Sequence, residues 1–133
     1  MKRVFADTFF FMAVLNRRDA AHPRAMEAYG HADYEFVTTE WVLTEVADAA
    51  ASPALRQGFK EFFHLLENDE KVEIIPASHE RFRSGLELYF ERPDKEWSLT
   101  DCISFVVMQD KNLTDALTGD HHFEQAGFVA LLK

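Results

Sequence analysis

Four acidic residues, Asp7, Glu45, Asp101 and Asp120, are spread over the whole chain. Three of them stand where a strand is expected to end or a helix to begin, and such positions line one crevice in an open parallel sheet. Carboxylates gathered there repel one another and therefore need hard cations, and Mg²⁺ or Mn²⁺ held in this way is suited to phosphate chemistry. The placement predicts one metal-binding carboxylate cluster built from distant segments.

Glu45 is the most informative of the four acids because its helical neighbours, Trp41, Val42 and Ala49, form an apolar stripe. An ionised carboxylate on such a stripe is costly to bury unless it meets a partner charge or a cation, and otherwise its pKa rises. The alternative is an amphipathic helix edge from which Glu45 reaches solvent or an arginine.

The other three acids have a plain structural alternative as helix caps. Aspartate at an N-cap is common and contributes about 1 kcal/mol without any function, and this applies to Asp7 and Asp120. Asp101 follows Ser98 at the spacing of a capping box. Their joint position at one edge of the predicted sheet favours a shared site over three independent caps.

Two further groups of reactive side chains carry weaker signals. His121 and His122 lie beside Asp120 and Glu124, which suggests a transition-metal site, but the spacing is not that of a zinc motif. Cys102 lies in an apolar segment with no histidine placed to activate it, which disfavours a thiolate nucleophile. The chain also has no glycine-rich phosphate loop.

The composition fits one globular domain over residues 1–133, with 47% apolar residues and 13 phenylalanines for a core rich in rings. The single cysteine excludes an internal disulfide and fits the reducing cytoplasm, which is the expected location. No apolar run reaches the roughly 18 residues that a membrane span needs, so no membrane association is expected.

The formal charge of −9 argues against a protein that holds nucleic acid by a continuous basic surface, because such binding depends mainly on neutralising phosphates. The 14 lysines and arginines are scattered along the chain. Any polynucleotide must therefore be held locally, by a few cations near the site where it reacts.

The segments that must position the four acids alternate between strands and helices. Apolar runs predict strands at residues 2–6, 35–38, 72–75, 115–118 and 128–132. Helical periodicity predicts helices at residues 8–15, 20–32, 39–51, 54–68, 79–90, 99–111 and 121–126. Asp7, Thr39 and Ser78 are expected N-caps, and Gly127 is an expected helix stop. The alternation predicts the α/β class, as a three-layer α/β/α sandwich with a mostly parallel five-stranded sheet.

With these residues in view, the chain resembles the PIN-domain nucleases, and more narrowly the VapC-type toxins of bacterial toxin–antitoxin pairs. The likeness runs from end to end. It is most specific at residues 98–105, SLTDCISF, and at residues 116–123, ALTGDHHF, which Gly127 and Phe128 follow. The opening strand into Asp7 and the LTEV stretch at residues 43–46 add to it.

The resemblance implies a five-stranded α/β/α fold and Mg²⁺- or Mn²⁺-dependent cleavage of RNA, with Asp7, Glu45, Asp101 and Asp120 around the metal. It also implies a homodimer and a cognate antitoxin that reaches into the acidic crevice. Thr8 is expected to add a hydroxyl or backbone contact beside the acids. Family members often have a small polar residue two places after the first aspartate, where this chain has Phe9.

The resulting hypothesis is a metal-dependent endoribonuclease in which a metal-activated water attacks an RNA phosphodiester. One alternative is a catalytically inactive PIN-like module that binds a protein or RNA without cutting it. Another is a phosphatase, but the second aspartate that usually stands two residues after the nucleophile is replaced here by Phe9. The presence of all four acids favours the nuclease.

Overall fold

The computed structural model describes residues 1–133 as five strands and seven helices. The strands are β1 (Lys2–Ala6), β2 (Tyr34–Thr39), β3 (Val72–Ile75), β4 (Asp115–Leu117) and β5 (Val129–Ala130). The helices are α1 (Thr8–Leu15), α2 (His22–Tyr29), α3 (Glu40–Ala49), α4 (Pro53–Glu67), α5 (His79–Glu91), α6 (Leu99–Asp110) and α7 (His121–Gln125). The predicted alternation of strands and helices is confirmed, and no helix has the length and apolar character needed to cross a membrane.

The five strands form one sheet in the order β3-β2-β1-β4-β5, and every neighbouring pair is parallel. The central strand β1 pairs with β2 through Phe5 and Val37, and with β4 through Phe5 and Ala116. The chain moves outward from β1 to β3 and then returns to β4 on the other side of β1. The strand order therefore reverses between β1 and β4, and a crevice is expected beyond their carboxyl ends.

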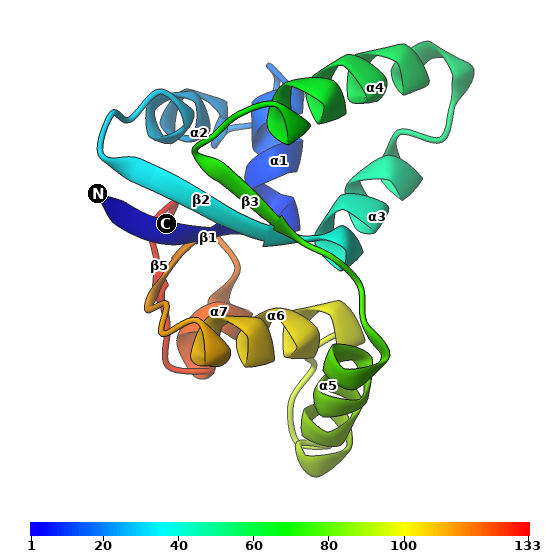
Figure 1. Cartoon of the computed structure of the whole chain (residues 1–133), viewed down its shortest axis with the longest axis vertical. Coiled ribbons are helices and arrows are strands. Elements are labelled where there is room, and N and C mark those ends of the chain that lie inside the picture. Colours follow the sequence, from blue (N-terminus) through cyan, green and yellow to red (C-terminus); the bar gives the residue numbers. More distant parts are fainter.

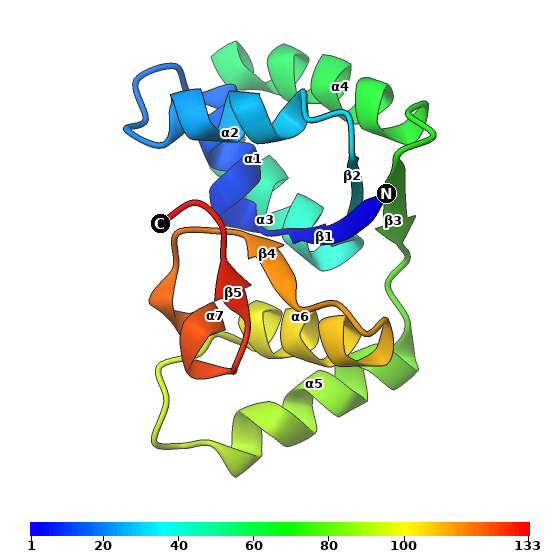
Figure 2. The same ribbon diagram turned by 90° about the vertical axis from the view of Figure 1, so that its left-hand side faces the viewer.

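Helices cover both faces of the sheet, which gives the three layers of the predicted α/β/α sandwich. Figure 1 shows α1 to α4 above the strands and α5 to α7 below them. The view turned by 90° in Figure 2 shows the same division, with β1 and β4 between the two helical layers. The helices that lead to β2 and β3 thus lie on one face, and those that lead to β4 and β5 on the other.

Aromatic side chains fill the core on both faces of the sheet. On the α1 side, the rings of Phe10 and Phe36 stack with centroids 6.1 Å apart. On the α6 side, Phe105 meets Phe123 edge to face at 4.9 Å. Pairs of this kind contribute about 0.5–1.5 kcal/mol each beyond the burial of their area. Both layers are thereby fixed against the central strand β1, from which Phe5 also packs on Phe123.

The caps of α3 and α5 are confirmed, but the expected cap of α1 is wrong. Thr39 accepts a hydrogen bond from the Val42 backbone N–H at 3.1 Å, and Ser78 caps α5 in the same way. Asp7 occupies the N-cap position of α1, yet its side chain makes no capping hydrogen bond. Its carboxylate is instead directed to the end of β4, as described below.

Three predicted boundaries differ from the structure by several residues. The helix expected over residues 20–32 is confined to His22–Tyr29, because Gly30 ends it before the chain enters β2. The helix expected over residues 39–51 ends at Ala49. The strand expected over residues 128–132 is only Val129–Ala130, although the backbone N–H of Leu132 still donates to the Thr118 carbonyl at 3.0 Å. At an edge strand only one neighbour supplies ladder bonds, so regular pairing ends early.

The packing of α5 on α6 depends on a glycine. A Cβ atom built on Gly85 would overlap the side chain of Ile103 and lie 3.2 Å from its Cα. Gly85 is the buried residue of α5, and Ile103 is fully enclosed in α6. The absence of a side chain at Gly85 thus sets how closely the two helices approach.

The first prediction concerns this contact. Gly85→Ala should lower the free energy of unfolding by about 1–3 kcal/mol, because overpacking outweighs the gain in helix propensity. Gly58→Ala in α4 is the matched control, since nothing lies within 4 Å of its built Cβ, and it should stabilise the protein by up to about 1 kcal/mol. Urea denaturation of both variants checks this, and equal stabilisation by both would contradict it.

Candidate active site

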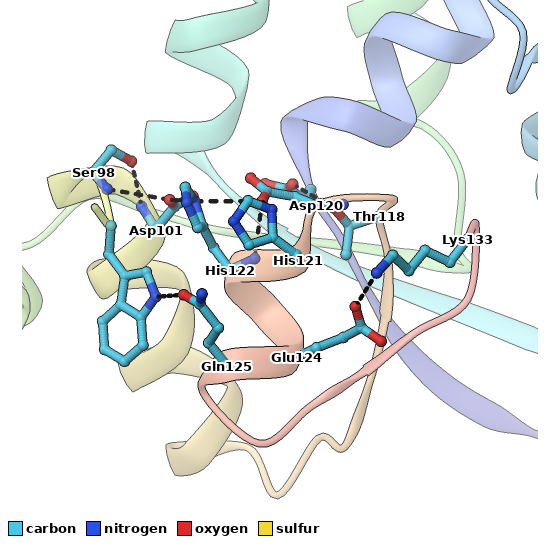
Figure 3. A network of polar contacts seen from close by, with 11 residues as sticks. Ser98, Asp101, Thr118, Asp120, His121, His122, Glu124, Gln125 and Lys133 are labelled. Atoms are coloured by element: carbon cyan, nitrogen blue, oxygen red, sulfur yellow. Dashed lines mark hydrogen bonds and ion pairs between the residues drawn. The ribbon is translucent and has the colours of Figure 1, made fainter. Parts of the chain in front are cut away.

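The structure brings Asp7, Asp101 and Asp120 together at the point where the strand order reverses. Asp7 directly follows β1, and Asp120 comes three residues after β4 ends. Asp101 lies in the first turn of α6, which packs against α7. Figure 3 shows Asp101 and Asp120 on neighbouring segments, with His122 between them. The structure therefore places these three predicted site residues near one another.

A buried threonine holds the two strand ends together. The hydroxyl of Thr118 donates to Oδ2 of Asp7 at 3.0 Å and accepts from the backbone N–H of Asp120, also at 3.0 Å. Thr118 is fully buried and Asp7 is only 5% exposed. Sequence reasoning missed Thr118, although its place between β4 and Asp120 marks it as the residue that leads into the site.

The carboxylate of Asp7 is held in an environment that disfavours its charge. Burial, together with the nearby charges of Asp101 and Asp120, raises the pKa of Asp7 to about 7, although hydrogen bonds from the Thr8 backbone and the Thr118 hydroxyl oppose the shift. Because its side chain makes no capping hydrogen bond, this carboxylate does not act as the usual side-chain cap of α1. Asp7 is thus more than the helix cap that was its simplest alternative explanation.

Asp101 and Asp120 do cap helices, and they also belong to the cluster. Ser98 and Asp101 form a reciprocal capping box at the start of α6, and Asp120 accepts from the His122 backbone N–H at 2.9 Å. Burial raises the pKa of Asp101, and the charge of Asp120 adds to the shift. Capping and membership of the acidic cluster are therefore compatible for these residues: the oxygen that serves the cap, Oδ2 of Asp101 or Oδ1 of Asp120, also lies close to Nδ1 of His122.

His122 is the residue of the site that sequence reasoning undervalued. Its Nδ1 atom lies 3.2 Å from Oδ2 of Asp101 and 3.3 Å from Oδ1 of Asp120 (Figure 3). The Nδ1 atom of His121 lies 3.6 Å from Oδ1 of Asp120, but that side chain is 64% exposed against 18% for His122. The sequence did contain a signal for His122. It stands two residues after Asp120, the N-cap of α7, and at this spacing its side chain can reach back to the capping carboxylate.

Glu45 joins the site through Thr8. The Thr8 hydroxyl donates to Oε1 of Glu45 at 2.6 Å, which connects the middle of α3 to the residue after Asp7. Glu45 is half-buried beside Val42 and Val46, as its place on the apolar stripe predicted. The expected hydroxyl contact of Thr8 beside the acids is confirmed, and it places Glu45 on the α1 side of the crevice.

Phe9 packs at the site, at the position where family members often have a small polar residue. A Cβ atom built on Gly119 would lie 2.6 Å from the tip of the Phe9 ring, so Gly119 is required for the close approach of this ring to the loop before Asp120. The ring therefore supports the position of Asp120 by packing, whereas a polar side chain would do so by hydrogen bonding.

A thiolate nucleophile is excluded at Cys102. The residue is fully buried in α6, and burial with the nearby charge of Asp101 raises the pKa of its thiol to about 11. The thiol is therefore protonated at neutral pH and unsuited to nucleophilic attack.

The donor set of the crevice fits a divalent cation. Burial and the charges of Asp101 and Asp120 raise the pKa of Asp7, and a bound cation would favour the charged form of this carboxylate. The potential ligand atoms of Asp120, His121 and His122 lie within 4.8 Å of one another. Carboxylate oxygens suit Mg²⁺ or Mn²⁺, and imidazole nitrogens suit transition ions.

The second prediction follows from the raised pKa of Asp7. In metal-free protein, folded Asp7 keeps its proton up to about pH 7, whereas the unfolded chain releases it near pH 4, so this group destabilises the fold increasingly as the pH rises between these values. Asp7→Asn removes this effect. The variant should be more stable than the wild type at about pH 8, by up to about 4 kcal/mol.

The measurement is urea denaturation in chelator across this pH range. The stability difference between Asp7→Asn and wild type should grow from about pH 4 to about pH 7 and then level off. Asp48→Asn, which removes an exposed carboxylate of α3, should leave the pH dependence of the wild type unchanged. A difference that is constant with pH would show that Asp7 ionises normally in the folded protein.

Known proteins resemble this chain over nearly its whole length. The chain is 29% identical over 136 aligned residues to the 23S rRNA-specific endonuclease VapC20 of Mycobacterium tuberculosis, with 95% of each chain covered. The crystal structure of M. tuberculosis VapC20, described as a sarcin-ricin loop cleaving toxin, superposes with a TM-score of 0.85 at 24% identity, covering 95% of this chain and 96% of that one.

Two other solved structures share the fold at lower identity. VapBC2 from Rickettsia felis, bound to a DNA fragment from its promoter, matches with a TM-score of 0.69 at 13% identity and 96% coverage of both chains. FitAcB from Neisseria gonorrhoeae matches at 0.65 with 15% identity, covering 96% of this chain and 94% of that one. The PIN domain family model matches residues 4–129, which include all four acids. The chain therefore belongs to the PIN domain family.

Proposed function

We propose that this protein is a divalent-metal-dependent endoribonuclease and the toxin of a toxin–antitoxin pair. The observation that carries the proposal is the convergence of Asp7, Asp101 and Asp120, from segments up to 113 residues apart in the sequence, where the strand order reverses. Family membership and the 29% identity to a 23S rRNA-specific endonuclease support the choice of RNA as substrate.

In the proposed mechanism, Asp7, Asp101 and Asp120 would hold the cation, and Glu45 would contribute from the side of α3. When bound, Mg²⁺ or Mn²⁺ lowers the pKa of a water molecule and neutralises charge that develops on the phosphate. The carboxylates orient the attacking water toward the phosphodiester, and Thr8 and Thr118 keep Glu45 and Asp7 in place. A cation bound between the acids would relieve their mutual repulsion, and this relief would favour its binding.

The inactive PIN-like module remains the alternative to this proposal. A module that only binds RNA or protein gains nothing from Asp7, whose carboxylate is buried at a cost and caps no helix. The buried carboxylate of Asp7 therefore favours an enzyme over an inactive binding module.

The third prediction tests the nuclease. Purified protein should cleave an RNA hairpin with the sequence of the sarcin–ricin loop in the presence of Mg²⁺ or Mn²⁺, and excess chelator should stop the cleavage. Asp7→Asn and Asp120→Asn should each lower the cleavage rate by about 100-fold or more, because each removes a charge that holds the cation.

Asparagine at position 120 can still accept the capping bond from His122, so the fold is preserved in that variant. Asp48→Asn is the control and should cleave at the wild-type rate. If the wild-type protein bound RNA but did not cleave it in the presence of Mg²⁺ or of Mn²⁺, the nuclease proposal would be wrong and the inactive binding module would be favoured. Cleavage of an unrelated hairpin at the same rate would remove the sarcin–ricin loop as the preferred substrate.

An apolar groove next to the site supports an antitoxin partner. The groove has a volume of about 310 Å³ and lies between α1, α3 and α4, lined by Met12, Val46 and Leu55 among others. Met12 and Val46 lie one helical turn or less beyond the bond between Thr8 and Glu45. A partner segment with apolar residues in the groove can therefore present a lysine or arginine to the carboxylates.

The net charge of −9 makes a basic antitoxin a suitable occupant of this groove, and the likeness to the VapBC2 and FitAcB structures agrees with such a partner. We therefore propose that the antitoxin inhibits the nuclease by occupying the groove and the acidic crevice together.

The fourth prediction tests the groove. Leu55→Asp should weaken binding of the antitoxin encoded beside this gene by about tenfold or more, because the variant buries a charge in an apolar groove. Leu65→Asp is the matched control, since Leu65 is also exposed on α4 but lies outside the groove. Both variants should cleave RNA at the wild-type rate. Equal antitoxin affinity for the two variants, measured by calorimetry, would rule out this groove.

Three further expectations belong to the same proposal. We propose that residues 1–133 act as a single domain in the cytoplasm and that two copies form a homodimer. The aromatic side chains of Phe82, Tyr89 and Phe90 on α5 are exposed and offer apolar surface for such a contact.

A further inference from the structure

A buried tryptophan joins the segment before α6 to the far end of α7. The indole N–H of Trp97 donates to Oε1 of Gln125 at 3.0 Å, and Trp97 is only 6% exposed (Figure 3). Trp97 directly precedes Ser98, the N-cap of α6, and Gln125 is the last residue of α7. A buried indole N–H needs a hydrogen-bond partner, and Gln125 supplies it. One bond therefore ties together the two helices whose starts carry Asp101 and Asp120.

Two further contacts hold the indole in place. Its ring meets Phe105 of α6 edge to face at 5.1 Å, and the guanidinium of Arg92 lies over it, 5.2 Å from the ring centroid. Arg92 is itself fixed by two hydrogen bonds to the carboxylate of Asp94, at 3.0 and 2.9 Å. The loop between α5 and α6 thus restricts the orientation of the indole, and with it the direction of its N–H.

The placement of α7 depends on contacts of this kind. The helix has five residues, His121–Gln125, so it is about 7.5 Å long and too short to be stable by itself. Packing of Phe123 on Phe105 anchors its middle. Apolar packing is non-directional, however, and does little to fix the rotation of a short helix about a single contact.

Two polar contacts join α7 to residues 97–101, one at each end of the helix. At the start of α7, His122 lies beside Asp101, and at its end Gln125 accepts from Trp97. The first contact belongs to the acidic cluster. The second contains no charged group and lies outside the cluster, so it holds α7 independently of the charge on the acids.

We propose that Trp97 and Gln125 are positioning residues of the active site. Their bond sets the orientation of α7 on α6, and thereby the place of Asp120 relative to Asp101. This inference rests on the proposed nuclease and adds two residues that act through its carboxylates. Because α7 is only about 7.5 Å long, a shift of about 1 Å at Gln125 moves Asp120 by a similar distance about Phe123. Misplacement by about 1 Å can lower a reaction rate by about 100-fold.

The fifth prediction removes either partner of this bond. Trp97→Phe keeps a ring against Phe105 but lacks the N–H, and Gln125→Leu lacks the acceptor. Each should lower kcat for the RNA hairpin at saturating metal by about tenfold or more. Each should also weaken Mn²⁺ binding, measured by calorimetry without RNA, by about tenfold or more. KM should change much less, because the proposal gives neither side chain a contact with RNA.

His22→Phe is the matched control. It removes another part-buried bond of a ring nitrogen, between His22 Nδ1 and the Ala13 carbonyl at 2.7 Å, in the helical layer on the other face of the sheet. The control should lose stability yet keep the wild-type kcat and metal affinity, at a temperature where circular dichroism shows every variant folded. If Trp97→Phe behaved like this control, the bond would only stabilise the fold and the proposal would be overturned.

The double variant tests whether the two residues act through one bond. Trp97→Phe combined with Gln125→Leu should lower kcat little further than the stronger single variant, because both substitutions remove the same interaction. Losses that add fully would show that the two side chains act separately, which would also overturn the proposal.

Hydrogen exchange of the metal-free chain tests the positioning without metal or RNA. The backbone amides of Asp101 and His122, which the caps of α6 and α7 hold, should exchange several times faster in Trp97→Phe and Gln125→Leu than in the control. Unchanged exchange would overturn the inference even if the protein is a nuclease. Faster exchange in a protein that cleaves no RNA would remove the nuclease and leave the positioning of the acids by this bond in place.

Discussion

The hydrogen bond between Thr118 and Asp7 holds a carboxylate inside the protein where burial and two neighbouring acids disfavour its charge. Asp7 makes no compensating cap, so the cost of its position must be offset by the rest of the fold. Such a cost is typical of functional sites, where a destabilised group is kept because its chemistry requires the strained arrangement. In this protein the arrangement is a set of carboxylates that a cation would stabilise.

The fold holds the acids in this unfavourable arrangement because it fixes the segments that carry them. β1 is paired on both sides, so the position of Asp7 at its end is set by β2 and β4 together. Aromatic contacts such as Phe105 with Phe123 lock α6 against α7, the two helices that carry Asp101 and Asp120. Because these elements are packed to high density, the carboxylates cannot move apart to relieve their repulsion.

Capping and function are combined in the same side chains at α6 and α7. The capping box of Ser98 and Asp101 fixes the start of α6, and Asp120 fixes the start of the short helix that contains His122. Each cap uses part of a carboxylate and leaves the group next to the site. A stability effect of replacing Asp101 or Asp120 is therefore compatible with a role in metal binding, and the two are separated by the asparagine variants, which retain the capping oxygen.

The sequence alone determined the order of strands and helices, the caps at Thr39 and Ser78, and the convergence of Asp7, Asp101 and Asp120, because these depend on local periodicity and on the rule that parallel strand ends share one edge. It left open whether Asp7 is a cap or a buried charge, and it undervalued Thr118 and His122. Those outcomes depend on which groups from distant segments meet, and on how much water each loses. Only the tertiary structure decides such contacts, since the bond from Thr118 to Asp7 joins residues 111 positions apart.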